Sequence, residues 1–132
     1  MTEQEILVHL KNIDFPNQLK NLLKKIKNKK VILYGAGEFF ETVKNNYDLS
    51  QLNIIGICDK RFYPEQEGQD FLGYKIIPFE KIKNYDTDYI LISTLKYLSI
   101  LDNLDTTLKG RKIKIEPLAK KTFISILKEI FG

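Results

Sequence analysis

The ten residues Val31–Phe40, VILYGAGEFF, decide the fold class of this chain. Four residues suited to a buried strand run into a Gly-x-Gly turn, and helical spacing of apolar residues follows the turn. In such a turn the first glycine lets the chain reverse tightly, and the second lets backbone N–H groups approach a phosphate at the start of the helix. The stretch therefore predicts a strand, a turn and a helix around a phosphate-sized seat.

A second strand supports this interpretation. Asn53–Cys58 is a continuous isoleucine-rich run, which is typical of a buried parallel strand, and Asp59 follows it. In dinucleotide-binding domains an acidic residue about 20 positions after the glycine turn accepts a hydrogen bond from a ribose hydroxyl. We therefore expect Gly35 and Gly37 at a phosphate, and Asp59 at a ribose, of one bound ligand.

Strands and helices alternate through the rest of the chain. Further strands are predicted at Tyr74–Ile77, Tyr89–Ser93 and Lys112–Ile115. The stretch Lys60–Gly73 is polar and is expected to be a long surface loop. Alternating elements with right-handed crossovers predict a three-layer α/β fold with a mainly parallel sheet of about five strands. Numbered along the chain, these five strands are expected in the order 3-2-1-4-5.

The length of 132 residues and a hydrophobic content of 43% predict a single domain, 1–132. We expect N-terminal helices at residues 1–29, an α/β core at 30–118 and a C-terminal helix at 119–132. An apolar stripe on that last helix covers the sheet or, alternatively, forms a homodimer seam. The stripe consists of Phe123, Ile126, Leu127 and Ile130.

Composition narrows the classes of partner and chemistry. The net charge is +4, but many lysines fall on the polar face of a predicted amphipathic helix, so we predict no nucleic-acid partner. No apolar run approaches the roughly 20 residues that span a bilayer, so we predict no membrane insertion and a cytoplasmic protein. A single cysteine, Cys58, and a single histidine, His9, predict no internal disulfide and no metal site.

Other residues of the candidate ligand site flank these positions. Ala36 and Glu38 belong to the glycine turn, although the charge of Glu38 opposes a phosphate. Ser93 and Thr94 end the fourth strand, where their hydroxyls hold a ligand or cap the next helix. Lys60, together with its neighbour Arg61, suits either a phosphate or a solvated loop.

Aromatic residues follow the turn where the dinucleotide fingerprint has a small residue. The ring of Phe40 is expected to push the helix from the sheet or to point into the space of a pyrophosphate. No reactive side chain accompanies the turn, so the catalytic residues stay unassigned. An enzyme would have to use Lys96 or Tyr97 as an acid.

The motifs YGAGEFF, IIGICDKRF, GQDFLGYKIIPFEKI and DTDYILIST occur in this order in the chain. Their order resembles the Rossmann-like domain of bacterial polysaccharide-biosynthesis proteins, at the N-terminus of sugar epimerases or dehydratases and of sugar acetyltransferases. It is also similar to the C-terminal domain of sugar C-methyltransferases. The positions that match are Gly35, Gly37, Asp59, Gly73 and the strand 88–93.

The resemblance covers about residues 30–118 and implies a nucleotide or nucleotide-sugar ligand more than turnover. It also implies that a complete active site needs a sugar-modifying partner enzyme or a second copy of the chain. The first hypothesis is therefore a stand-alone nucleotide-binding or nucleotide-sugar-binding module of surface-polysaccharide biosynthesis, non-catalytic by itself. The alternatives are a small NAD(P)-dependent sugar-modifying enzyme and a degenerate module that acts in oligomerisation or partner docking, its crevice closed by Phe39 and Phe40.

Overall fold

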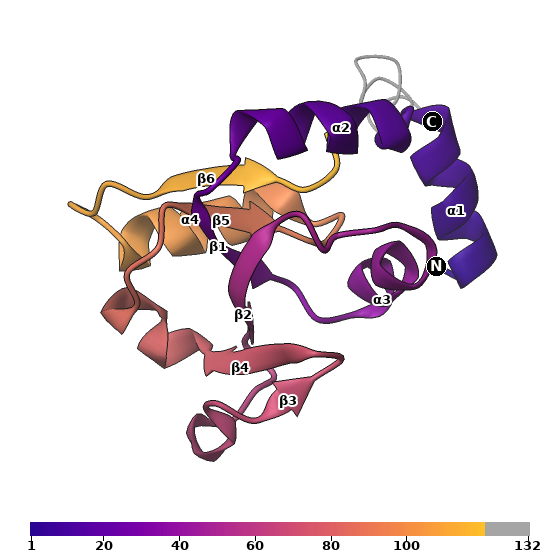
Figure 1. Cartoon of the computed structure of the whole chain (residues 1–132). Coiled ribbons are helices and arrows are strands. Elements are labelled where there is room, and N and C mark those ends of the chain that lie inside the picture. The colour runs from indigo at the N-terminus through magenta and orange to yellow at the C-terminus, as the bar shows by residue number, and fades with distance from the viewer. Residues whose placement is uncertain (121–132) are drawn as a thin grey trace.

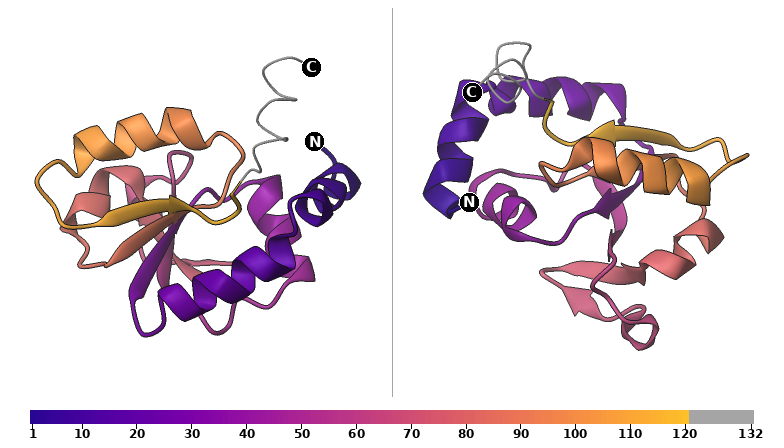
Figure 2. Two further views of the ribbon diagram at one scale, coloured as in Figure 1. Left: turned by 90° about the horizontal axis from the view of Figure 1, so that it is seen from above. Right: turned by 180° about the vertical axis from the view of Figure 1, so that it is seen from behind.

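The computed structural model describes residues 1–120 and shows one twisted sheet with helices on both faces (Figures 1 and 2). The strands are β1 (Lys30–Tyr34), β2 (Asn53–Asp59), β3 (Asp70–Phe71), β4 (Tyr74–Pro78), β5 (Tyr89–Ile92) and β6 (Lys114–Pro117). They lie in the order β3-β4-β2-β1-β5-β6. The predicted C-terminal helix with its stripe of Phe123, Ile126, Leu127 and Ile130 lies outside the described residues from position 121 onward.

The α/β fold class and the order of the parallel strands are confirmed. The predicted order 3-2-1-4-5 corresponds to β4-β2-β1-β5-β6, and every pair within it is parallel. Strand β1 is in the centre and is buried from Val31 to Tyr34, because helices cover both faces of the sheet. The sequence indicates this order since right-handed crossovers leave few alternatives for alternating strands and helices.

The structure adds β3, a short strand that pairs antiparallel with β4 at the edge of the sheet. The expectation of a long loop over Lys60–Gly73 is therefore wrong, because this stretch contains β3 and a 3₁₀ helix, η1 (Pro64–Gln66). The hairpin turn explains the difference. Leu72 and Gly73 both have positive φ, 51° and 93°, and two such residues form the tight turn that favours a hairpin.

The helices separate into two layers. On one face α1 (Glu3–Asn12), α2 (Phe15–Lys25) and α3 (Glu38–Asn46) pack over the side of β1 that carries Val31 and Leu33. On the other face α4 (Tyr97–Thr107) and the 3₁₀ helix η2 (Phe79–Asn84) pack over Ile32 and Tyr34. Figure 2 shows these two layers on opposite sides of the sheet. The layers carry two separate apolar clusters, one for each face.

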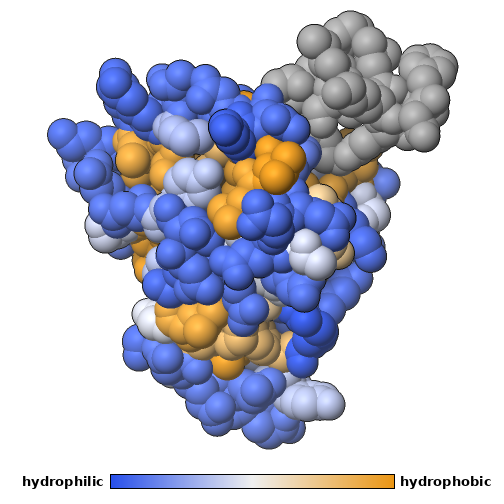
Figure 3. Space-filling model, turned by 90° about the vertical axis from the view of Figure 1, so that its right-hand side faces the viewer, coloured by the Kyte–Doolittle hydropathy of each residue, from blue (hydrophilic) through white to orange (hydrophobic). Residues whose placement is uncertain are grey.

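The side of the molecule near α1 and α3 is shown in Figure 3, where polar side chains separate patches of apolar ones. The lower patch lies at the level of the β3–β4 hairpin. In and beside this hairpin, Phe62, Phe71 and Tyr74 are only partly buried and pack against the core. Within residues 1–120, each helix is too short or too polar to cross a bilayer.

Phe40 packs beneath this hairpin and not into the mouth of the glycine turn. Its side chain is fully buried, and its ring centroid lies 6.3 Å from that of Phe71 and 6.0 Å from that of Tyr74. The expectation that Phe40 points into the space of a pyrophosphate is therefore wrong. Its position in the first turn of α3 directs the ring toward the β3–β4 edge. The aromatic residues of the hairpin receive the ring there, so the helix–sheet contact does not need a small residue at this position.

Replacing Phe40 by alanine is expected to lower the free energy of unfolding by about 3–5 kcal/mol, because it removes a fully buried ring and leaves a cavity. Urea denaturation measures this loss. The matched control is Leu98→Ala, since the Leu98 side chain is 76% exposed and its truncation should change stability by about 0.5 kcal/mol or less. Equal losses for both variants would contradict the packing described for Phe40.

Candidate functional site

A cleft of about 510 Å³ lies at the carboxyl ends of β1, β2 and β5. Strand β1 lies between β2 and β5, and the chain adds strands first on the β2 side and then on the β5 side. Ligands of open α/β sheets bind at the carboxyl ends of the strands where the order reverses in this way. Except for Ala36, every residue predicted for the ligand site lines the cleft. These residues are Gly35, Gly37, Glu38, Asp59, Lys60, Ser93 and Thr94.

Position 35 requires glycine because the turn after β1 lies very close to the end of β5. Its φ is +123°, and a Cβ at this position would lie 2.8 Å from the carbonyl oxygen of Ser93. The Ser93 hydroxyl donates to the Gly35 carbonyl at 2.7 Å, and the Gly35 N–H donates to the carbonyl of Cys58 at 2.9 Å. Both neighbouring strands therefore hold the turn in place.

Gly37 has a different environment. Its φ of −97° and ψ of −160° are extended values that any residue adopts, and a Cβ would meet only Arg61 Nη2 at 3.6 Å. The protein's own packing therefore does not require glycine at this position. Helix α3 begins at the next residue, and no side chain caps its first turn. The absent Cβ leaves the backbone of the turn open to the cleft.

Asp59 joins the glycine turn to the end of β2. Its Oδ2 accepts hydrogen bonds from the Ala36 N–H at 2.8 Å and from Arg61 Nη2 at 3.1 Å. Its Oδ1 accepts from the Arg61 N–H at 3.0 Å and from Arg61 Nε at 3.1 Å. Ala36, absent from the cleft lining, thus contributes its backbone donor to this network.

The pKa of the Asp59 carboxyl is set by two opposing effects. Burial raises this pKa, whereas the hydrogen bonds from Arg61 and from Ala36 lower it, and the net shift is downward. The same contact raises the pKa of Arg61. The two side chains are therefore a charged pair at neutral pH, with Asp59 largely buried and Arg61 66% exposed.

The two hydroxyl residues after β5 do not cap α4. Ser93 is fully buried, and its hydroxyl donates to the Gly35 carbonyl in the turn. Thr94 Oγ1 accepts only a long hydrogen bond of 3.4 Å, from the Lys96 N–H. Helix α4 begins at Tyr97 without a side-chain cap. The capping alternative is therefore wrong, because the close contact with Gly35 takes Ser93 away from the helix start.

The cationic residues at the cleft have different surroundings. Lys60 Nζ lies 5.1 Å from the ring centroid of Phe79, which favours a cation–π contact at the cleft edge. Lys96 is exposed at the position before α4. With Arg61 they give three positive charges against the carboxylates of Glu38 and Asp59. The cleft therefore carries a small excess of positive charge.

Helix α4 supplies part of the cleft wall that sequence reasoning missed. Ser99, Ile100 and Asn103 line the cleft opposite the glycine turn. The available signal was the four-residue spacing of Ser99 and Asn103, which places both on one helix face. Phe39 also lines the cleft, yet the cleft stays open. The premise that Phe39 and Phe40 close the crevice is therefore wrong, because Phe40 packs beneath the hairpin.

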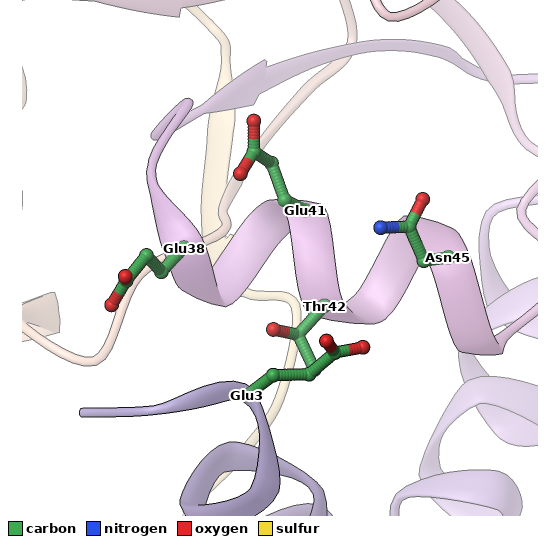
Figure 4. Close-up of a pocket in the computed structure, with 5 residues that line it drawn as sticks. All are labelled: Glu3, Glu38, Glu41, Thr42 and Asn45. Carbon is green, nitrogen blue, oxygen red and sulfur yellow. The ribbon is translucent and has the colours of Figure 1, made fainter.

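A second pocket lies on the outer side of α3, between that helix and the start of α1 (Figure 4). Glu3, Glu38 and Glu41 contribute carboxylates to it, but those of Glu38 and Glu41 point away from each other. Within residues 1–120, no group of three or more His, Cys, Asp and Glu side chains is placed to hold a metal ion. This pocket therefore suits neither a phosphate nor a cation.

The single cysteine and the single histidine of the chain lie away from the cleft lining. Cys58 is fully buried in β2, and burial raises the pKa of its thiol. Such a thiol is a poor nucleophile because the thiolate is the reactive form. His9 lies on α1, on the face of the sheet opposite α4.

The two glycines of the turn are expected to respond differently to substitution by alanine. Gly35→Ala should cost about 2 kcal/mol or more, because it combines a left-handed backbone with a backbone clash. Gly37→Ala should cost about 1 kcal/mol or less, since an extended conformation with ordinary contacts accepts a Cβ. Thermal unfolding of both variants tests this, and equal stabilities would contradict it.

The Asp59 network predicts a pH-dependent contribution to stability. The lowered pKa in the folded state means that its contribution is complete above the unfolded pKa of about 3.9 and is lost as pH falls through the folded pKa. Asp59→Asn should therefore cost about 1–2 kcal/mol at pH 7. Urea denaturation from pH 7 to pH 2.5 should show the two proteins converging below about pH 4. A constant difference over this range would exclude the proposed linkage.

No curated protein matches the chain. Solved structures of RSP, a Rex-family repressor, are similar to it. RSP in complex with beta-NADH has 18% identity and a TM-score of 0.49 over 86% of this chain and 63% of that one. RSP in complex with beta-NAD+ and operator DNA has 20% identity and a TM-score of 0.46 over 85% and 59%. A further RSP structure has 18% identity and a TM-score of 0.47 over 87% and 61%.

The chain spans about three fifths of the length of each of these RSP chains. At such identities, the likeness shows the fold alone. The comparison with RSP does not support the expected role in polysaccharide biosynthesis or a nucleotide-sugar ligand.

The prediction of no nucleic-acid partner is contradicted by the comparison with RSP, a repressor whose complex includes operator DNA, and it is withdrawn. The charge pattern did not justify that exclusion. Lys20, Lys24 and Lys27 are exposed along α2 and its C-terminal end, and none has a carboxylate partner among residues 1–120. A solvated lysine face and a face that binds an anion have the same sequence pattern.

The sequence also matches a protein-family model, described as "C2185-like, N-terminal", over residues 27–115. This match runs from the residues before β1 into the first half of β6 and includes every strand that borders the cleft. It covers about two thirds of the 132 residues. The chain therefore belongs to the C2185-like N-terminal family.

Proposed function

We propose that the chain is a single Rossmann-like domain that binds a nucleotide or a nucleotide-sugar in the cleft at the ends of β1, β2 and β5. The observation that carries this proposal is the environment of Gly37. The fold itself accepts a side chain there, yet the position is glycine and faces the cleft beside the uncapped start of α3. This glycine leaves space for a ligand beside the turn.

The proposed phosphate position lies against the turn at Gly35 to Gly37. The first N–H groups of α3 have no side-chain cap and are available to phosphate oxygens. The partial positive charge of the helix start favours an anion, although the exposed carboxylate of Glu38 weakens this effect. Lys60 and Lys96 at the cleft edge add positive charge.

The rest of the cleft suits the nucleoside or sugar part of such a ligand. Its volume of about 510 Å³ falls in the range of roughly 300–1,000 Å³ that is usual for small-molecule sites. Phe39 and Ile100 supply apolar surface for a ring, whereas Thr94, Ser99 and Asn103 supply polar groups. This mixture of apolar walls and a few polar groups is typical of small-molecule sites.

The proposed role is binding and positioning. Lys96 is exposed, and burial raises the pKa of the Tyr97 hydroxyl, which makes it a weaker acid. The resemblance of residues 30–118 to polysaccharide-biosynthesis proteins supports a role beside a sugar-modifying partner enzyme. We therefore favour a nucleotide-binding module of surface-polysaccharide biosynthesis that is non-catalytic by itself.

A thermal-shift screen with UDP-glucose, ADP, NADH, NADP+, coenzyme A and S-adenosylmethionine tests this proposal. A ligand at 100 times its dissociation constant should stabilise the protein by about 2.7 kcal/mol, which raises the melting temperature by roughly 5–20 °C. Gly37→Val should unfold close to the wild-type temperature without ligand and should lose the shift, because the side chain fills the phosphate position.

The matched control is Lys27→Gln, a change at an exposed residue that does not line the cleft. This variant should keep the full ligand-induced shift. If no compound stabilises the wild-type protein, the proposal fails. If Gly37→Val keeps the shift, the ligand binds somewhere other than the glycine turn.

A further inference from the structure

The Asp59 carboxylate is saturated by protein donors. An ionised carboxylate has about four lone-pair sites, and Asp59 accepts four N–H groups, three from Arg61 and one from Ala36. Its side chain is only 15% exposed. A ribose hydroxyl would therefore have to displace Arg61 or the glycine turn to donate to this carboxylate.

Arg61, in contrast, keeps unused donors. A guanidinium group carries five N–H donors, and Asp59 uses one on Nε and one on Nη2. No other acceptor for the Arg61 side chain is present among residues 1–120. The side chain is 66% exposed and lines the cleft, with Nη2 3.6 Å from the Cβ position of Gly37. Three donors thus remain beside the glycine that the fold does not require.

The Asp59–Arg61 contact also fixes where these donors point. Two N–H groups of one guanidinium meet the two oxygens of one carboxylate, and this paired geometry restricts the rotation of the arginine. The downward pKa shift of Asp59 and the upward pKa shift of Arg61 keep both groups charged over the neutral range. The end of β2 therefore presents a held cation, and not an open carboxylate, to the cleft.

We propose that Arg61 is the residue that selects the ligand, by binding an anionic phosphate oxygen beside Gly37, and that Asp59 is a positioning residue. This inference rests on the proposed function, because it names the chemical group by which the nucleotide or nucleotide-sugar is recognised. Asp59 fixes the position of Arg61 relative to the glycine turn through its hydrogen bonds to both. Ribose hydroxyls do not bind to Asp59 and do not contribute to recognition there.

The selected phosphate has two chemical sources: the pyrophosphate of a nucleoside diphosphate or nucleotide-sugar, or the additional phosphate of a phosphorylated dinucleotide. The two sources differ in the ligands that depend on Arg61. A pyrophosphate contact makes ADP, UDP and UDP-glucose all depend on it. A contact with the additional phosphate makes NADP+ bind more tightly than NAD+, and only this preference disappears without Arg61.

Isothermal titration calorimetry tests the inference with pairs of probes that differ in one group. Two pairs differ in the diphosphate: ADP and adenosine, and UDP and uridine. NADP+ and NAD+ differ in the additional phosphate. ADP and 2′,3′-dideoxy-ADP differ in the ribose diol. The proteins are the full-length wild type, Arg61→Gln, Arg61→Lys, Asp59→Asn and the control Lys27→Gln. Each variant is first checked by its melting temperature, so that titrations use folded protein.

We expect phosphate-bearing probes to bind the wild type, the nucleosides to bind at least tenfold more weakly, and dideoxy-ADP to bind within about twofold of ADP. Arg61→Gln should weaken by about tenfold or more the probes that carry the selected phosphate, since it removes charge-assisted hydrogen bonds. These probes are ADP and UDP if Arg61 binds the pyrophosphate, and NADP+ alone if it binds the additional phosphate. Arg61→Lys should recover part of this loss because the charge remains. Asp59→Asn should weaken ADP and dideoxy-ADP equally, while Lys27→Gln should match the wild type.

The failure of this inference is distinct from the failure of the proposed function. If phosphate-bearing probes bind the wild type but Arg61→Gln behaves like Lys27→Gln, Arg61 does not select the ligand and the nucleotide-binding function stands. A second outcome would overturn the inference: the wild type binds dideoxy-ADP much more weakly than ADP, and Asp59→Asn weakens ADP but not dideoxy-ADP. That result would assign Asp59 to the ribose. If no probe binds the wild type, both proposals fail.

Discussion

The close contact between the turn after β1 and the end of β5 is the constraint on which the rest of the structure depends. Gly35 lies so near the backbone of Ser93 that only a residue without Cβ fits, and the Ser93 hydroxyl and the Cys58 carbonyl hold the turn from both sides. Because β1 is the central buried strand, this contact sets where the chain leaves the sheet. It thereby sets the direction of α3 and the mouth of the cleft.

The polar network at the cleft divides into a part that maintains the fold and a part that faces the ligand space. The Ser93 hydroxyl and the Asp59 carboxylate are engaged by the protein. Arg61 and the backbone after Gly37 keep donors for which the described residues 1–120 show no side-chain acceptor besides Asp59. Because Arg61 and the start of α3 offer N–H donors while the oxygens of Asp59 are already occupied, the cleft is matched to anionic oxygen more than to hydroxyl groups. This polarity is why phosphate recognition is the centre of our proposal.

Much of the fold was predictable because it follows from local patterns. The apolar run Val31–Tyr34, the glycines after it and the isoleucine-rich β2 are each encoded within a few residues, and right-handed crossovers then leave few strand orders. The β3–β4 hairpin was missed because its turn is built from Leu72 and Gly73, and leucine is an unusual residue with positive φ. The direction of Phe40 was missed because the aromatic cluster that receives it, with Phe71 and Tyr74, lies about thirty residues further along the chain.

The sequence by itself determined the α/β class, the order of the parallel strands and the set of residues at their carboxyl ends, because periodicity and chain topology act over short stretches. Only the tertiary structure decided what those residues do. Ser93 and Asp59 have the same types and spacing whether they face a ligand or the protein, and their hydrogen bonds to the glycine turn form only when β1, β2 and β5 are side by side. Folding used the Ser93 hydroxyl and the Asp59 carboxylate to hold the turn and left donors of Arg61 at the cleft.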